Sequence, residues 1–134
     1  MKKLVLCLFL FVSIQVMGQT INDSQYVQLS SVYYITPGHS NLTFGQRQCI
    51  WDQGRYLSFI NPDCKILLKA YSSDIEYGKY GNKLLQKRIK IIKNLLITDC
   101  NVDSSRFIVI LIGNMVKTNN NPVANQRVDI EIIN

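Results

Sequence analysis

The sequence is poor in the residues from which metal centres and catalytic sites are usually built. It has a single histidine, His39, and four cysteines whose spacing matches no zinc-binding pattern. It also contains no pair of carboxylates, no nucleophile beside a base and no glycine-rich phosphate loop. We therefore expect a protein that is not an enzyme and that needs no metal or cofactor.

A long apolar run occurs only once, at the N-terminus. Lys2 and Lys3 precede a largely apolar stretch at 4–17, which is the pattern of a secretory signal peptide. The stretch is short for a membrane anchor, and no basic residue follows it directly. We predict a signal peptide at 1–18, cleavage before Gln19, and a mature chain without a transmembrane span.

Acidic residues are outnumbered by basic ones. The chain carries 15 Lys and Arg against nine Asp and Glu, and losing Lys2 and Lys3 leaves 13 − 9 = +4. This excess favours anionic partners such as acidic polymers or membrane headgroups, whereas export argues against nucleic acid. The remaining residues, 19–134, suffice for one domain and are too few for two.

Patterns of apolar residues predict an alternation of strands and helices. The predicted strands are 26–35, 64–71, 106–113 and 127–133, and the predicted helices are 42–59 and 79–97. The continuous apolar run at 106–113 is typical of a strand covered on both faces. The alternating strand at 127–133 should have one face in water. The order predicts a two-layer α/β sandwich with the helices packed on one sheet.

This order and two local motifs resemble the OmpA-like peptidoglycan-binding domain of bacterial envelope proteins. That family's second strand usually ends in Gly-Tyr-Thr-Asp, and "AYSS" at 70–73 takes this place. "YGNKLLQKR" at 80–88 follows the family's spacing of tyrosine, leucine and two basic residues, and "NQRVDIEI" at 125–132 matches its closing motif. The resemblance covers roughly 27–133 and implies a β-α-β-α-β-β fold, with two helices packed on a mixed four-stranded sheet.

The resemblance also implies a function and a site. It implies an exported domain, periplasmic or associated with the outer membrane, that binds the diaminopimelate of the peptidoglycan stem peptide. The family uses an aspartate at the strand end and a helix arginine, which Arg88 matches. Arginine grips a carboxylate with two parallel hydrogen bonds. The aspartate position is Ser73 and the family's helix asparagine is Gly81, so Asp74 is the candidate replacement anion, and Arg127 is expected to shape the rim.

These two departures leave a second hypothesis open. A degenerate member of the family could keep the fold but serve as a structural module or bind an envelope protein partner instead of peptidoglycan.

Three cysteines remain after the predicted cleavage. In a strand-helix-strand unit with parallel strands, both strands start at the same end of the sheet and the helix returns the chain there. Cys64 begins the second strand, and Cys100 lies in the connection from the second helix to the third strand. We therefore predict a Cys64–Cys100 disulfide at the end opposite the site, with Cys49 as a buried thiol.

Overall fold

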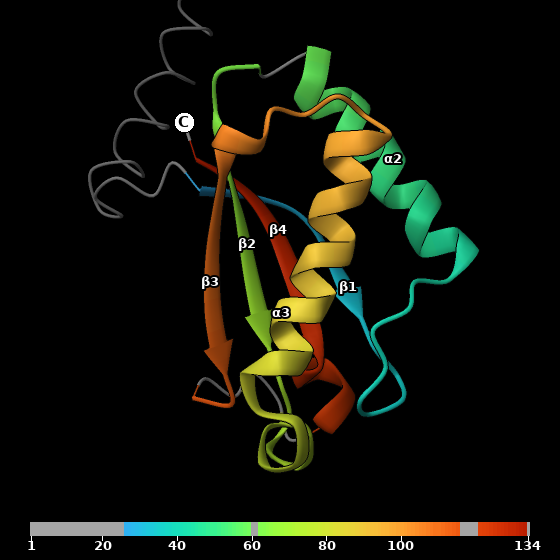
Figure 1. The fold of residues 1–134 in the computed structure, drawn as a ribbon, viewed down its shortest axis with the longest axis vertical. Helices are drawn as coiled ribbons and strands as arrows, with labels where there is room; N and C mark the ends of the chain where they lie inside the picture. Colours follow the sequence, from blue (N-terminus) through green and yellow to red (C-terminus); the bar gives the residue numbers. More distant parts are fainter. Residues whose placement is uncertain (1–25, 60–61, 116–120, 134) are drawn as a thin grey trace, which may run out of the picture.

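The computed structural model describes residues 26–59, 62–115 and 121–133, which form two layers, a sheet and a pair of helices (Figure 1). The predicted signal peptide at 1–18 and its cleavage site before Gln19 lie outside these residues. No helix within the described ranges is both long and apolar enough to cross a membrane.

The described elements follow the predicted order. They are β1 (Tyr26–Tyr33), α2 (Phe44–Phe59), β2 (Lys65–Tyr71), α3 (Asp74–Thr98), β3 (Phe107–Gly113) and β4 (Arg127–Ile133). The sheet order is β1-β4-β2-β3, with β4 antiparallel to β1 and β2, and β2 parallel to β3. The predicted two-layer β-α-β-α-β-β sandwich with a mixed four-stranded sheet is therefore confirmed.

One face of the sheet packs against the helices and forms the core. The central strands contribute alternate residues to it, namely Ile66, Leu68, Ala70, Val128, Ile130 and Ile132. The helices contribute Ile50 and Leu57 from α2 and Leu85, Ile89, Ile92 and Leu96 from α3. The spacings of four, three and four along α3 place these side chains on one side of the helix. Burying each one fully stabilises the fold by about 1.5–3 kcal/mol.

Helix α3 begins earlier than predicted and is interrupted. Ser73 caps its N-terminus by accepting a hydrogen bond from the backbone N–H of Glu76 at 3.3 Å. Gly81, at φ 60° and ψ −149°, has a non-helical conformation that essentially only glycine adopts. A short segment, 74–80, therefore precedes the long segment whose periodicity predicted the helix, and the two run in different directions in Figure 1.

The predicted environments of two strands are wrong. β3 lies at the edge of the sheet, and its side chains Ile108, Val109 and Ile110 are 41–43% exposed. β4 is instead one of the two central strands, and all of its residues but the last are buried, including Asp129 and Glu131. Strand order depends on pairing with distant segments, so an apolar run does not by itself identify a central strand.

The cysteine predictions also need correction. None of the described cysteines, Cys49, Cys64 and Cys100, is in a disulfide, so the predicted Cys64–Cys100 bond is not formed in the structure. The two sulfurs contact different groups, because Cys64 Sγ lies 3.4 Å from a guanidinium nitrogen of Arg106 and Cys100 Sγ lies 3.8 Å from the carbonyl oxygen of Trp51. Cys49 is exposed rather than buried.

Candidate functional site

The predicted site residues gather around the end of the sheet where β2 stops and α3 starts. Gln126, directly before β4, holds this corner together. Its side chain accepts a hydrogen bond from Ser73 Oγ at 2.9 Å and donates one to the carbonyl of Tyr34 at 2.7 Å. The backbone N–H of Tyr34 donates in turn to the carbonyl of Gln126 at 2.8 Å. The Ser73 hydroxyl is thus buried and serves the helix cap and this corner.

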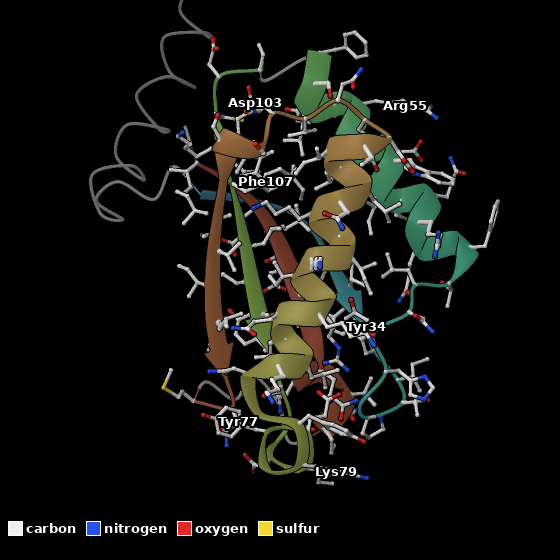
Figure 2. All side chains as sticks on the ribbon, viewed as in Figure 1. Tyr34, Arg55, Tyr77, Lys79, Asp103 and Phe107 are labelled. Carbon is white, nitrogen blue, oxygen red and sulfur yellow. The ribbon has the colours of Figure 1, made fainter. Side chains whose placement is uncertain are left out.

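Arg88 is fully buried at this corner and is bound to a carboxylate of its own chain. Its Nη1 donates to Glu76 Oε1 at 3.0 Å, and its Nη2 donates to Glu76 Oε2. Its Nε donates to the carbonyl of His39 at 2.8 Å, and its guanidinium carbon lies 4.0 Å from the centre of the Tyr34 ring. Figure 2 shows Tyr34 between α3 and the loop that follows β1. Such parallel, charge-assisted bonds are the strong form of arginine–carboxylate pairing.

The backbone completes the carboxylate's surroundings. The N–H of Gly38 donates to Glu76 Oε2 at 2.9 Å. Gly38 has a φ of 82°, and a Cβ there would fall 2.6 Å from ring atoms of Tyr80. Glycine is needed at this position for both reasons, since only glycine adopts this conformation freely and only glycine leaves room for the ring.

Glu76 can reach Arg88 only because Gly81 interrupts the helix. The two residues are twelve positions apart, which is about 18 Å along an unbroken α-helix. Glu76 was not among the predicted site residues, although "SDIE" at 73–76 has the S-x-x-E pattern of a capping box and could have placed the helix start at Ser73. No sequence signal indicates that the Glu76 side chain would turn to Arg88.

Asp74, the candidate replacement anion, lies on the outside of the same segment. It is exposed, and its carboxylate accepts a hydrogen bond from the side chain of Asn114, just after β3, at 3.1 Å. The carboxylate in contact with the Arg88 guanidinium therefore belongs to Glu76, two residues further along the chain.

Arg127 lies on the other face of the sheet. Because its neighbour Val128 points into the core, the alternation of a strand turns Arg127 and Asp129 to the opposite face. Arg127 donates from Nε to Asp129 Oδ1 at 3.0 Å and from Nη1 to the carbonyl of Ala124 at 2.8 Å, and it stacks 3.7 Å from the ring centre of Tyr71. The structure therefore brings Ser73 and Arg88 to one corner and leaves Arg127 behind the sheet.

Two buried hydroxyls at this corner have no hydrogen-bond partner within the part of the chain that the structure describes, those of Tyr34 and Ser72. Burial raises the pKa of the Tyr34 phenol, so the group stays neutral. Tyr34 and His39 also line a cavity of about 300 Å³, together with Thr36, Asn41 and Gln46. Among the described residues, no group of three or more His, Cys, Asp or Glu is placed to hold a metal ion.

The fold and this corner define an OmpA-like domain architecture, which comparison with solved structures supports. Comparisons with known protein families and with curated proteins find no match. Among solved structures, the chain is similar to the peptidoglycan-associated lipoprotein from Burkholderia pseudomallei, with a TM-score of 0.66 and 18% identity over 76% of this chain and 88% of that one.

Two further solved structures have the same architecture. The OmpA-like domain of FopA1 from Francisella tularensis matches with a TM-score of 0.63 and 19% identity over 79% of this chain and 70% of that one. The C-terminal domain of MotB from Helicobacter pylori matches with a TM-score of 0.67 and 14% identity over 78% of this chain and 84% of that one. The chain therefore has the OmpA-like fold, as its motifs predicted.

Proposed function

We propose that this protein is an exported domain of the cell envelope that binds peptidoglycan non-covalently through its stem peptide. Three observations support the proposal: the OmpA-like fold, the N-terminal pattern of a signal peptide, and the similarity to a protein named for its association with peptidoglycan. The domain acts as a binding module, not as an enzyme, and resides in the periplasm or at the outer membrane.

The observation that carries the proposal is the set of three hydrogen-bond donors around the Glu76 carboxylate. Arg88 presents both terminal nitrogens in parallel, and Gly38 adds a backbone N–H at 2.9 Å. The same three donors suit the carboxylate of an amino-acid head group such as diaminopimelate. In this proposal Arg88 binds the carboxylate of the ligand.

The ammonium group of the ligand requires acceptors nearby. Asp74 provides a carboxylate at the surface of this corner, and the Ser73 hydroxyl lies beside it at the helix cap. We assign the ammonium to Asp74, because the buried Ser73 hydroxyl is already bonded to Gln126 and to the backbone N–H of Glu76. Arg127 contributes indirectly, because its bond to the carbonyl of Ala124 fixes the turn that places Gln126 against Ser73.

A sedimentation experiment with insoluble sacculi tests the proposal. Arg88→Ala alone would leave Glu76 buried without its partner, so the better variant replaces both residues by methionine, a change that buried ion pairs often tolerate. Wild type should sediment with sacculi and Glu76→Met/Arg88→Met should not. Lys87→Ala is the matched control, because it removes an exposed positive charge one residue away. Equal sedimentation of wild type and the double variant would refute Arg88 as the contact.

Export is tested separately. Mass spectrometry of the protein from the envelope fraction should find a chain that begins at or near Gln19. Recovery of intact Met1 on the functional protein would contradict the predicted cleavage.

One observation favours a second function. Arg88 is fully buried and already paired, which is what a degenerate site would show if the fold had been kept for binding an envelope protein partner. If this second function is correct, neither wild type nor any variant at Glu76 or Arg88 should sediment with sacculi, although all of them should fold.

A further inference from the structure

The carboxylate of Glu76 takes up every contact that Arg88 and Gly38 offer to a ligand. Both of its oxygens meet the guanidinium, and one also receives the backbone N–H. A ligand carboxylate cannot reach the same donors while Glu76 is there. Binding through Arg88 therefore requires Glu76 to leave.

The segment that carries Glu76 lies mostly at the surface. In the segment 74–80, Glu76 is the one buried residue, whereas Ile75 and Tyr77 are 65% and 40% exposed. Its outer contacts include the Asp74–Asn114 hydrogen bond, the Tyr77 ring beside Gly113 at the end of β3, and the packing of Tyr80 beside Gly38. A helical piece of seven residues is not stable by itself in water. The pair with Arg88 is the one buried ion pair that attaches it to the domain.

The segment also has a hinge at its end. Gly81 supplies the non-helical backbone that lets the segment fold back onto Arg88. At the other end the chain leaves β2 through Ser72 and Ser73. Figure 2 shows Tyr77 and Lys79 on this segment at the end of the molecule, with Tyr77 beside the end of β3. Rotations at Gly81 and at the junction after Ser73 would together withdraw Glu76 without disturbing the long part of α3.

We propose that Glu76 is an internal competitor of the ligand, so that a stem-peptide carboxylate binds by replacing it on Arg88 while residues 74–80 swing open at Gly81. This inference rests on the proposed function. The exchange replaces one charged partner of Arg88 with another, so the buried guanidinium is not left without a counter-ion. It also brings a polar ligand to the side of Arg88 on which Tyr34 lies, whose hydroxyl has no partner among the described residues in the closed form.

Competition by Glu76 lowers the apparent affinity of the wild type for its ligand, because only the open fraction of the molecules can bind. If the closed form outweighs the open form by about ten to one, a variant that cannot close should bind the same ligand about tenfold more tightly. The direction of this effect is opposite to that of an ordinary mutation in a binding site, which weakens binding.

The first experiment asks whether an external carboxylate can occupy the position of Glu76. The melting temperature of Glu76→Ala is measured in sodium acetate and in sodium chloride of equal ionic strength. Acetate should raise it specifically, and wild type and Glu76→Met/Arg88→Met should respond alike to the two salts. Identical melting of Glu76→Ala in acetate and chloride would overturn the proposal.

The second experiment measures sacculus binding of two variants that favour opening by different means. Glu76→Gln removes the charge that competes for Arg88. Gly81→Ala disfavours the folded-back backbone, and since no atom lies within 4 Å of the new Cβ, it does so without a steric clash. Both should bind sacculi about tenfold more tightly than wild type, whereas Lys87→Ala should not. Gly81→Ala leaves Glu76 and Arg88 intact, so it decides the matter if Glu76→Gln folds poorly.

The two proposals fail in different ways. If wild type binds sacculi and neither Glu76→Gln nor Gly81→Ala binds more tightly, internal competition is wrong and the proposed function stands. If acetate stabilises Glu76→Ala but no variant binds sacculi, Glu76 occupies a true carboxylate site and the proposed ligand is wrong.

Discussion

Two buried arginines on opposite faces of the sheet have nearly the same surroundings but are built in different ways. Arg127 and Arg88 each stack on a tyrosine ring, at 3.7 and 4.0 Å, and each pairs with a carboxylate. The partner of Arg127 is two residues away on the same strand. The partner of Arg88 is twelve residues away, beyond a break in the helix.

Because of this difference, we infer that the Arg127–Asp129 pair is permanent and that the Arg88–Glu76 pair is replaceable. Asp129 is fixed by β4, paired on both sides, and also accepts a hydrogen bond from Ser31 at 2.6 Å. Glu76 is carried by a short segment outside the core. Equal burial therefore does not mean equal permanence, because the element that supplies the partner decides whether it can leave.

Breaking the Arg88 pair should have the largest effect on stability. Arg88→Ala removes a fully buried guanidinium, its bond to the carbonyl of His39 and the attachment of Glu76, and we expect a loss of about 3–5 kcal/mol in the free energy of unfolding. Urea denaturation measures this loss. Glu76→Met/Arg88→Met should recover most of the stability, and a double variant as unstable as Arg88→Ala would show that the loss has another cause.

The same change at Arg127 should cost less. Arg127→Ala leaves Asp129 with its hydrogen bond from Ser31, and we expect a loss of about 1.5–3 kcal/mol, the range for hydrogen bonds to charged groups. The two alanine variants should be compared in one urea titration series. If Arg127→Ala loses as much stability as Arg88→Ala or more, the two pairs do not differ in the way proposed.

The ion pair Lys69–Glu131, on the same face as Arg127, should contribute less than either arginine pair. Its nitrogen and oxygen are 2.9 Å apart, and the lysine side chain is 25% exposed, so Lys69→Met should cost at most about 1 kcal/mol near pH 7. Burial alone would lower the pKa of Lys69, but its hydrogen bond to Glu131 and the negative charges of Tyr71, Glu131 and Asp129 together outweigh this, and the pKa is raised.

The raised pKa fixes the sign of the pH dependence. The pair contributes fully below the pKa of an unfolded lysine, about 10.4, and its contribution is lost as the pH rises through the folded pKa. The stability difference between wild type and Lys69→Met should therefore shrink in alkaline solution. A difference that grows above pH 10 would contradict the assignment.

Removing the hydroxyl of Tyr34 should have almost no effect or a small favourable one. Tyr34→Phe keeps the ring on Arg88 and deletes a buried group that has no partner among the described residues, so stability should change by less than about 0.5 kcal/mol or rise. Thermal unfolding of the two proteins tests this. A loss above about 1 kcal/mol would mean that the hydroxyl is bonded in solution.

The patterns of apolar residues predicted the helices and strands well, because the period of each pattern depends only on the local backbone conformation. The strand at 127–133 was placed with its observed bounds, since the alternation of Val128, Ile130 and Ile132 has the period of a strand. The order of elements then restricted the architecture to a two-layer sandwich. The place of each strand in the sheet was not predictable in this way, and β3 was wrongly assigned to the interior.

The site was only half visible in the sequence. The register of "YGNKLLQKR" identified Arg88, but its partners Glu76, Gly38 and His39 come from segments that meet only after folding. Asp74 was the expected anion because it is nearest in sequence to the family's aspartate position. That anion was predicted to meet the ammonium of the ligand. The helix break at Gly81 brings a different carboxylate, that of Glu76, to Arg88, and no periodicity reveals it.

The place of β4 in the sheet has a consequence for how the chain folds. Among the described strands β1 pairs only with β4, and Tyr26 pairs with Ile133, which is 133 − 26 = 107 residues later. A chain synthesised from its N-terminus can pair β2 with β3 early, through the helix between them, but must hold β1 open until residues 127–133 emerge. Such distant pairing slows folding. The domain therefore stays incomplete through most of its synthesis, a state in which a polypeptide can still be threaded through a secretion channel.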